Sequence, residues 1–357
     1  MRMKVLVLLV LASLAGATCK HRVLDSREAS EISAAGKAQP CPLPIISHAV
    51  LPELSSPSGF DDTSNSNRAQ QGRYSHRARD IIVRQGKPIW IIGKFTYGYL
   101  DADLIGEEVE IYFSKNGELP FQKIGDVKTT KPGEHAPVDG IVDDGGRIFV
   151  ELSSLGIESL PIGRHRVLLV VTGDNSSTEM FIDVVGPTTQ FVVTDIDGTL
   201  TEGEYSSATE IYDQPPQSYL GATDVLNTLY KKGYHIFYLT SRAEWFHTRT
   251  RTWLANNQFP PGTLRTTPSV IGAKGAAASK FKTNELLLLK DRTGLVPVYA
   301  FGNKESDVKA YAASGIAPSQ SYYFNLGEDA AAGGISHTDY LKLTKTFQTI
   351  PTGCPDN

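Results

Sequence analysis

The chain has 357 residues, with 35 basic and 39 acidic side chains and a formal net charge of −4 at pH 7. This length suits two domains with additional terminal segments. A general nucleic-acid binder needs an excess of basic side chains to neutralise phosphates, and this composition has none. We therefore expect no nucleic-acid partner, although a local basic pocket is compatible with the overall charge.

The first 17 residues have the layout of a secretory signal peptide. Arg2 and Lys4 precede an apolar run over residues 5–14, and Ala-Gly-Ala follows at residues 15–17. This order of basic, apolar and small residues is typical of a cleaved leader. The apolar run is short for a membrane span, although an uncleaved anchor is the alternative. We expect a secreted or lumenal protein, with peripheral membrane contact as an option.

The three cysteines, Cys19, Cys41 and Cys354, lie outside the two domains predicted below. None lies near a histidine cluster, so we do not expect metal binding by thiolates. In an oxidising compartment two of them can pair, which leaves one over. A Cys41–Cys354 bond would join the two terminal segments, but the sequence does not decide the pairing.

Residues 18–78 are rich in Ser, Ala, Pro, Asn and Gln and have little periodicity, so we expect a disordered linker. Residues 79–187 change to short apolar segments separated by turn residues, a pattern that predicts an antiparallel β-sandwich domain. The expected strands are residues 81–83, 89–92, 109–113, 148–152, 166–171 and 180–185.

Residues 188–335 alternate between strand and helix patterns. This alternation predicts an α/β domain with a Rossmann-like parallel sheet and helices on both faces. We expect residues 336–357 to be a C-terminal tail. The expected strands are residues 191–193, 235–239, 298–301 and 322–324, and the expected helices are residues 222–232, 243–257, 280–290 and 306–314.

An Asp-Ile-Asp-Gly-Thr segment at residues 195–199 follows the first strand of this domain. Asp195 and Asp197 are two residues apart, and residues at this spacing share a face of an extended chain. The Gly-Thr turn adds backbone N–H groups that can hold an anion. A carboxylate nucleophile beside a second carboxylate and a bound cation is suited to phosphoryl transfer through an aspartyl-phosphate. A mere helix cap is the competing interpretation.

Polar residues also follow the next strand of the predicted sheet. Thr240, Ser241 and Arg242 come directly after residues 235–239. The carboxyl ends of parallel strands meet at one edge of the sheet, so these side chains should lie near the aspartate pair. A hydroxyl and a backbone N–H at this place can hold a phosphoryl oxygen. We therefore expect these three residues to bind the phosphate of a substrate. Their place beside the aspartate pair argues against the interpretation of that pair as a mere helix cap.

A third polar group follows residues 298–301, in a Gly-Asn-x-x-x-Asp segment that contains Asn303 and Asp307. Their side chains supply the oxygen ligands that Mg²⁺ prefers. A lysine between these elements would neutralise the charge of the phosphate. Lys280 and Lys282 are both available for this task.

This ordered set resembles the haloacid dehalogenase (HAD) superfamily of phosphatases. The resemblance implies that Asp195 attacks phosphorus and that Asp197 protonates the leaving oxygen and later activates water. It implies a Mg²⁺ ion bridging Asp195, the main-chain carbonyl of Asp197 and the segment with Asn303 and Asp307, directly or through water. Thr240 and the lysine would hold the phosphoryl group.

Two longer segments narrow the resemblance. Asp-Ile-Asp-Gly-Thr-Leu-Thr and Gly-Asn-x-x-x-Asp-Val-x-x-Tyr are similar to the lipins, which are Mg²⁺-dependent phosphatidate phosphatases. Roughly residues 79–330 are similar to the C-terminal β-domain and lipin-like domain of the membrane-associated phosphatidylinositol transfer proteins of the retinal-degeneration-B type. By this comparison the lysine of the family aligns with Lys282 in preference to Lys280.

The animal transfer proteins of this type sense phosphatidate without hydrolysing it, and their nucleophile position is not an aspartate. This chain keeps Asp195 and Asp197, so the resemblance here favours catalysis. The segments after residues 201 and 241 are too short for a full cap domain, so we expect an open site with a minimal cap. An open site can meet a lipid headgroup at an anionic membrane surface.

We expect a Mg²⁺-dependent phosphatase of a phosphomonoester, with phosphatidate as the favoured substrate. One alternative is a non-catalytic module of a membrane-associated lipid-transfer-type protein, which binds phosphatidate or phosphoinositide. Another is a soluble small-molecule phosphatase next to a β-sandwich that binds proteins. The intact aspartate pair favours the first interpretation.

Overall fold

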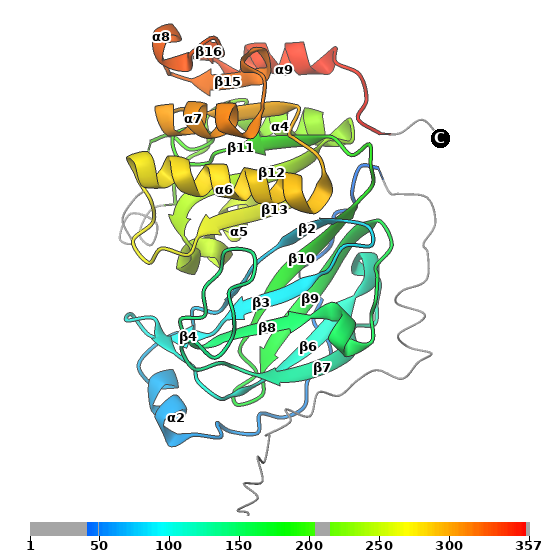
Figure 1. The fold of residues 1–357 in the computed structure, drawn as a ribbon, viewed down its shortest axis with the longest axis vertical. Coiled ribbons are helices and arrows are strands. Elements are labelled where there is room, and N and C mark those ends of the chain that lie inside the picture. Colours follow the sequence, from blue (N-terminus) through cyan, green and yellow to red (C-terminus); the bar gives the residue numbers. More distant parts are fainter. Residues whose placement is uncertain (1–40, 49, 204–214, 355–357) are drawn as a thin grey trace, which may run out of the picture.

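The computed structural model describes residues 41–48, 50–203 and 215–354. It contains a β-rich domain and an α/β domain that pack against each other (Figure 1). The expected signal peptide, the linker up to residue 40 and residues 355–357 of the expected tail lie outside the described residues. In the described part of the chain, no helix combines the length and apolar character needed to span a bilayer.

The β-rich domain is a sandwich of two sheets with a separate hairpin. The three-stranded sheet is ordered β1 (Arg77–Ala78), β3 (Trp90–Lys94), β8 (Arg147–Glu151). The five-stranded sheet is ordered β2 (Ile81–Arg84), β10 (Ser177–Val185), β9 (Gly163–Val171), β6 (Glu108–Ser114), β7 (Gln122–Lys128). The hairpin pairs β4 (Thr96–Tyr97) with β5 (Ala102–Asp103). The pairs are antiparallel as expected, except that β2 lies parallel to β10 at the sheet edge.

Strand β9 shows how the sandwich core forms. Val167, Leu169 and Val171 belong to the core between the sheets, whereas Leu168 packs on the opposite face of β9. Successive side chains of a strand point to opposite faces, so this alternation places one set inside. The opposite face of β9 is covered in part by Leu54 from the segment before the domain.

The described part of the expected linker, residues 41–78, is more ordered than we expected. Helix α2 spans Thr63–Ala69, and the Asp62 carboxylate caps it by accepting the N–H of Ser64 at 2.7 Å. Arg166 of β9 donates to the main-chain carbonyls of Ser47 and Val50, at 2.9 and 2.7 Å. Isolated long-range contacts of this kind leave no periodic pattern in the sequence, which is why composition alone suggested disorder.

The α/β domain has a six-stranded sheet in which all neighbours run parallel. The chain winds outward from β11 (Phe191–Thr194) in one direction and then from β14 (Tyr299–Gly302) in the other. In such a sheet a crevice forms beyond the carboxyl ends of the two strands where the direction reverses. The order is β13 (Gly262–Thr267), β12 (His235–Ala243), β11 (Phe191–Thr194), β14 (Tyr299–Gly302), β15 (Ser321–Phe324), β16 (Ile335–His337).

Helices cover both faces of this sheet, as expected. Leu286 packs in one cluster with Val193 of β11, whereas Leu226 packs in another with the adjacent Val192. Adjacent strand residues point to opposite faces, so the two helices that carry these leucines lie on opposite sides. One face carries α6 (Gly275–Thr293), α7 (Glu305–Ser314) and the short α8 (Glu328–Ala331), and the other carries α4 (Ala222–Lys231), α5 (His247–Asn256) and α9 (Tyr340–Gln348).

The described part of the expected C-terminal tail belongs to the fold. Strand β16 adds to the sheet beside β15, and α9 packs against α4. Tyr340, Leu343 and Phe347 of α9 are buried. Their spacing of three and four residues is that of one helix face. This segment is therefore a structural element with a clear helical pattern, which we had not recognised.

Buried charges join the two domains. The Asp80 carboxylate is fully buried and accepts from Arg251 at 2.8 Å and from the N–H of Leu264 at 2.9 Å, both in the α/β domain. Arg79 of the sandwich lies 2.8 Å from the Glu285 carboxylate of α6. A buried charge is strongly unfavourable unless it is paired, so these contacts fix one relative orientation of the domains.

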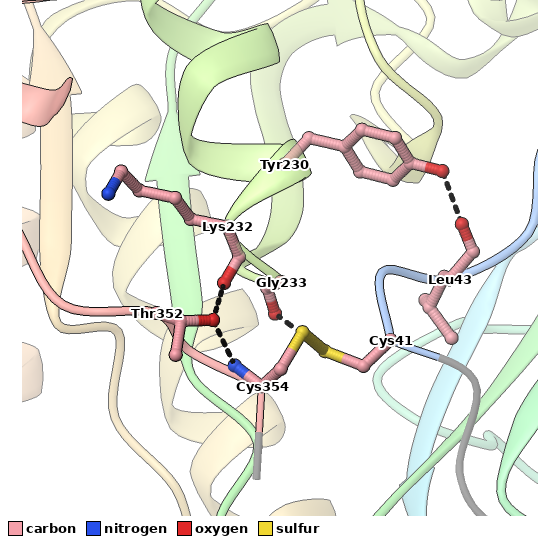
Figure 2. The surroundings of a disulfide bond; sticks show 7 residues. All are labelled: Cys41, Leu43, Tyr230, Lys232, Gly233, Thr352 and Cys354. Carbon is pink, nitrogen blue, oxygen red and sulfur yellow. Dashed lines mark hydrogen bonds between the residues drawn. A yellow bond between two sulfur atoms is a disulfide. The ribbon is translucent and has the colours of Figure 1, made fainter. Parts of the chain in front are cut away.

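A disulfide joins the N-terminal segment to the C-terminal end (Figure 2). Of the pairs that the sequence allowed, the structure forms Cys41–Cys354, with a sequence separation of 313. Both sulfur atoms lie against Gly233, which follows α4 and has a φ of 89°. A side chain at this glycine would collide with both sulfurs. The hydroxyl of Tyr230 also donates to the carbonyl of Leu43, so both ends of the described chain lie on the α/β domain.

Candidate active site

Asp195 lies directly after β11, at the point where the sheet reverses direction. Its N–H donates to the carbonyl of Phe301 in the neighbouring β14 at 2.9 Å, and its side chain is buried. The chain then turns at Gly198, which has a φ of 73°, and the N–H of Leu200 returns to the carbonyl of Ile196 at 2.8 Å. A positive φ costs glycine little, so this turn holds the aspartate pair at the sheet edge.

Lys282 of α6 reaches two buried carboxylates. Its Nζ lies 2.8 Å from Oδ1 of Asp195 and 2.5 Å from Oδ1 of Asp307. Lys282 is buried, whereas Lys280 is exposed. Of the two lysines that the sequence offered, the structure therefore brings Lys282 to the aspartates.

The electrostatics of the site favour a further cation. Burial raises the pKa of Asp195 to about 7, and the nearby Lys282 offsets this only in part, because Asp307 and Asp197 add repulsion. Burial alone would lower the pKa of Lys282, but the two carboxylates outweigh it and hold that pKa above its usual range. Three carboxylates here pair directly with two cationic side chains, Lys282 and Arg242, while Lys274 and Lys304 line the same cavity. An additional positive charge would therefore stabilise ionised Asp195.

Asp307 also shapes the loop between β14 and α7. Its Oδ2 accepts the N–H groups of Asn303 and Lys304, each at 3.1 Å. Gly302 permits this approach, since a Cβ at that position would lie 2.6 Å from the Cβ of Asp307. Both carboxylate oxygens of Asp307 are thus engaged by the protein. Its predicted role as a metal ligand stays a prediction, and in the structure it positions Lys282 and Asn303.

Asp197 is held by two residues that we predicted as phosphate ligands. Arg242 places Nη2 at 2.7 Å from Oδ1 and Nε at 2.9 Å from Oδ2 of Asp197. The hydroxyl of Thr240 donates to Oδ2 at 3.0 Å. Arg242 is itself oriented by the hydroxyl of Thr250 at 3.2 Å. Arg242 and Thr240 therefore position the candidate acid–base group here, and their phosphate contacts stay predictions.

A cavity of about 310 Å³ opens onto this group. Asp195, Asp197 and Lys282 lie in its wall together with Ser241. Among the described residues, the buried hydroxyl of Ser241 has no hydrogen-bond partner. A buried polar group normally has a partner, so this hydroxyl is available to a ligand. The volume, and the cationic side chains of Arg242 and Lys282 in the wall, suit a ligand that carries a compact anionic group.

The donor atoms present fit Mg²⁺. The carboxylate of Asp195, the main-chain carbonyl of Asp197 and the amide oxygen of Asn303 are all hard oxygen ligands. Asn303 Oδ1 lies 3.3 Å from the hydroxyl of Thr199, which ties it to the turn after β11. Within the described ranges, no group of three or more His, Cys, Asp and Glu residues could hold a metal ion. A site of this composition would therefore depend on the carbonyl, the amide and waters.

The rim of the cavity is apolar, and Val270 and Ile271 in it are residues that we had not singled out. Trp245, in the short helix η3 (Glu244–Phe246), lines it together with Val270 and Ile271 from the loop between β13 and α6. The indole N–H of Trp245 donates to the carbonyl of Val270 at 2.9 Å. The signal available in the sequence was an adjacent pair of large aliphatic residues inside a loop between Pro268 and Gly272.

Comparisons with known proteins match both domains. Residues 74–184 match the family model "PITM 1-3, beta-sandwich domain", and residues 192–325 match "PITM 1-3, LNS2 domain". Membrane-associated phosphatidylinositol transfer protein 1 of Rattus norvegicus is 31% identical over 251 residues, covering 70% of this chain and 18% of the rat protein. Protein retinal degeneration B of Drosophila melanogaster is 28% identical over 252 residues, with coverages of 70% and 18%. The expected resemblance to the lipin-like region of such proteins is confirmed, and the chain spans less than a fifth of the length of these relatives.

Solved structures show weaker similarity. A D,D-heptose 1.7-bisphosphate phosphatase from B. bronchiseptica, complexed with magnesium and phosphate, has a TM-score of 0.35 and 12% identity, covering 44% of this chain and 97% of that one. A cobalt-bound deoxy-D-mannose-octulosonate 8-phosphate phosphatase from Haemophilus influenzae has a TM-score of 0.32 and 14% identity, with coverages of 45% and 88%. The fold assignment depends instead on the strand order described above.

Proposed function

Because this chain carries the β-sandwich and LNS2 domains of the PITM 1-3 proteins, and LNS2 is a lipin-like HAD domain, we propose that it is a Mg²⁺-dependent phosphatase of a phosphomonoester. We propose phosphatidate as its substrate. The observation that carries the proposal is the buried Asp195, paired with Lys282 and adjacent to Asp197 at the cavity wall. The relatives are named for phosphatidylinositol transfer and membrane association, so a phospholipid is the substrate class that their names favour.

The proposed reaction has two steps. The Asp195 carboxylate attacks phosphorus, and the bond between phosphorus and the ester oxygen breaks while Asp197 gives that oxygen a proton. Water then attacks the aspartyl-phosphate as Asp197 takes its proton, which releases phosphate and restores Asp195. Lys282 and the Ser241 hydroxyl would hold the phosphoryl oxygens. A Mg²⁺ ion held by Asp195, the Asp197 carbonyl and Asn303 would supply charge neutralisation for the transferring group.

One observation favours the alternative of a non-catalytic lipid-binding module. Both carboxylate oxygens of Asp197 are engaged by Arg242 and Thr240. A general acid must contact the leaving oxygen before it can give that oxygen a proton, and both oxygens of Asp197 already have partners in the protein. For catalysis, Arg242 would have to exchange Asp197 for a phosphoryl oxygen when substrate enters. A module that only binds phosphatidate needs no such exchange.

Phosphate release by the purified full-length protein tests the proposal. Phosphatidate vesicles and water-soluble phosphomonoesters would be offered with Mg²⁺ or with excess EDTA. We expect release with Mg²⁺, none with EDTA and none from Asp195→Asn, because an amide cannot form the aspartyl-phosphate. Release from soluble esters but not from vesicles would contradict the lipid substrate. Vesicle binding without release from any ester would favour the non-catalytic alternative.

We also propose that the protein is secreted or lumenal. The N-terminal sequence pattern motivates this, and the Cys41–Cys354 bond supports it, because structural disulfides persist in oxidising compartments. N-terminal sequencing of the mature protein is expected to begin at Thr18. A mature N-terminus that includes the apolar run would contradict cleavage.

A further inference from the structure

Pairs of large apolar side chains are exposed at two loop tips. In the β4–β5 hairpin, Tyr99 is 97% exposed and Leu100 is 89% exposed. In the loop between β13 and α6, Val270 is 64% exposed and Ile271 is 88% exposed. Single exposed apolar residues are common on protein surfaces, but grouped ones mark contact surfaces. In Figure 1 both loops lie on the same side of the molecule, at the left.

A chain of direct contacts fixes the two tips relative to each other. Asp101, directly after the hairpin pair, lies 2.7 Å from Nη1 of Arg77. Nη2 of the same guanidinium lies 3.2 Å from the Glu244 carboxylate in the α/β domain. Trp245, the next residue, donates to the carbonyl of Val270 at 2.9 Å. One arginine thus connects the hairpin of the sandwich to the loop that carries the other apolar pair.

The same loop forms the rim of the candidate active site. Val270, Ile271 and Trp245 line the cavity whose wall contains Asp195 and Lys282. The contacts described above connect the hairpin to this rim, so both tips have a fixed position relative to the cavity.

Exposed basic side chains flank both tips. Arg73, whose carbonyl accepts the N–H of Gly98 in the hairpin at 3.0 Å, is exposed, and so is Lys274, three residues after Ile271. Apolar groups that enter the boundary of the acyl chains, next to cations that meet anionic headgroups, are typical of membrane interfaces. A protein interface has a contiguous, closely packed core, whereas these tips protrude separately.

We propose that Tyr99, Leu100, Val270 and Ile271 form one membrane-docking face, which seats the protein on an anionic bilayer with the cavity open toward the headgroups. This docking face extends the proposed function and rests on it, because the docked protein would give a membrane phosphomonoester a route to Asp195. The β-sandwich thereby supplies two of the four docking residues, Tyr99 and Leu100.

Vesicle binding by the full-length protein tests the proposal. The probes are phosphatidylcholine vesicles in which about one lipid in five is phosphatidate or phosphatidylglycerol. We expect the double variant Tyr99→Ser/Leu100→Asp and the single variant Ile271→Asp each to weaken binding to both anionic vesicles by about ten-fold or more, because each places a charge at the apolar boundary. Phosphatidylglycerol carries a phosphodiester, so it reports on the surface separately from the phosphomonoester site.

Leu341→Asp is the matched control, since Leu341 is 45% exposed and lies on α9, away from both loops (Figure 1). It should bind vesicles like the wild type. The hairpin variant should keep the wild-type melting temperature and the wild-type hydrolysis of a soluble phosphomonoester.

The outcomes separate the two proposals. Failure of the wild type to bind both kinds of anionic vesicle overturns the docking face, and so does wild-type binding by both the hairpin variant and Ile271→Asp. Loss of binding only in Ile271→Asp would overturn the contribution of the sandwich. Absence of hydrolysis with intact, variant-sensitive binding would overturn the proposed phosphatase function and leave the docking face supported.

Discussion

Thr240 and Ser241 are adjacent residues near the carboxyl end of β12, yet their hydroxyls have different surroundings. Thr240 donates to Asp197 at 3.0 Å, whereas the buried Ser241 hydroxyl has no partner in the described part of the chain and lines the cavity. The sequence suggested the same role for both. The structure separates them into a residue that positions Asp197 and a residue whose hydroxyl has no partner among the described residues, and we propose the second as a ligand of a phosphoryl oxygen.

We expect Ser241→Ala to raise the KM for a phosphomonoester about ten-fold, because a hydrogen bond to a charged group is worth about 1.5–3 kcal/mol. Its free energy of unfolding should not fall, since an unpaired buried hydroxyl is removed. Thr240→Ala should lower kcat with little change in KM, because it loosens Asp197. Steady-state kinetics with a soluble phosphomonoester distinguishes the two. Equal effects of both variants on KM would contradict the separation of roles.

At the scale of elements, the loop from β14 into α7 depends on one buried carboxylate. Asp307 accepts the Asn303 and Lys304 N–H groups with one oxygen and pairs with Lys282 through the other. Asp307 thereby connects α6, α7 and the end of β14. Its loss would leave a buried ammonium with one partner and two N–H groups without an acceptor.

Asp307→Ala should therefore lower the free energy of unfolding by about 3–5 kcal/mol, the usual result of breaking a buried ion pair from one side. Asp307→Asn should cost less, because the amide oxygen can still accept hydrogen bonds. Urea unfolding measures both. Glu305→Ala in the same helix turn is the control, since its exposed pair with Lys309 should contribute under about 1 kcal/mol. Similar losses in Asp307→Ala and the control would contradict this role.

The elements that the sequence predicted best carry strong periodic patterns. The apolar runs of β11 and β12 and the helical spacing of α4 were recognised because each buries a regular face. Strand β7 was missed: its sequence, Gln-Lys-Ile-Gly-Asp-Val-Lys, has few apolar residues because it is the edge strand of its sheet. A periodic apolar pattern in the sequence indicates buried side chains, and an edge strand with few of them leaves little such pattern.

The candidate site was predictable to a similar degree. Strand ends predicted that Asp195, Thr240 and Asn303 would meet, because parallel strands bring their carboxyl ends to one edge. Side-chain pairing was not predictable, and Arg242 holds Asp197 in a way that sequence spacing does not encode. Such contacts depend on rotamers and on packing between segments far apart in the chain.

At the scale of the whole molecule, buried histidines make stability depend on pH. Burial lowers the pKa of His76 in the sandwich to about 3, and burial together with Arg251 lowers that of His247 at the domain interface to about 3. In an unfolded chain a histidine has a pKa of about 6.5. The folded state therefore binds fewer protons than the unfolded one between these values. Stability is full above about pH 6.5 and is lost as the pH falls toward 3.

Each of these histidines should lower the free energy of unfolding by up to about 1.4 kcal/mol for each unit by which the pH falls in that window. Asp195, with its raised pKa, acts in the opposite direction between about pH 7 and 4, so the comparison with a variant is needed. We expect His247→Gln to have a shallower loss of unfolding free energy than the wild type between pH 6.5 and 5, measured by urea unfolding. Parallel pH profiles of the two proteins would contradict a neutral buried His247.

The Cys41–Cys354 bond closes almost the whole described chain into one loop, with the cysteines 313 residues apart in sequence. It holds the segment near Leu43 and the end that follows α9 against Gly233 (Figure 2). A crosslink over so long a loop mainly restricts the unfolded chain. Its effect should therefore appear in global stability and in the attachment of the two ends, more than in the geometry of the site.

We expect reduction, or the double variant Cys41→Ser/Cys354→Ser, to lower the free energy of unfolding by about 2–4 kcal/mol. Hydrogen exchange should become faster in α9 and near residue 43, while β11 and β14 stay protected, because their hydrogen bonds lie within the sheet. The double variant is its own control, since a reductant should not lower its melting temperature further. If the reductant shifts the variant as much as the wild type, the stabilisation does not come from this bond. If α9 exchanges at the wild-type rate without the crosslink, the packing of Tyr340, Leu343 and Phe347 alone holds the C-terminal end in place.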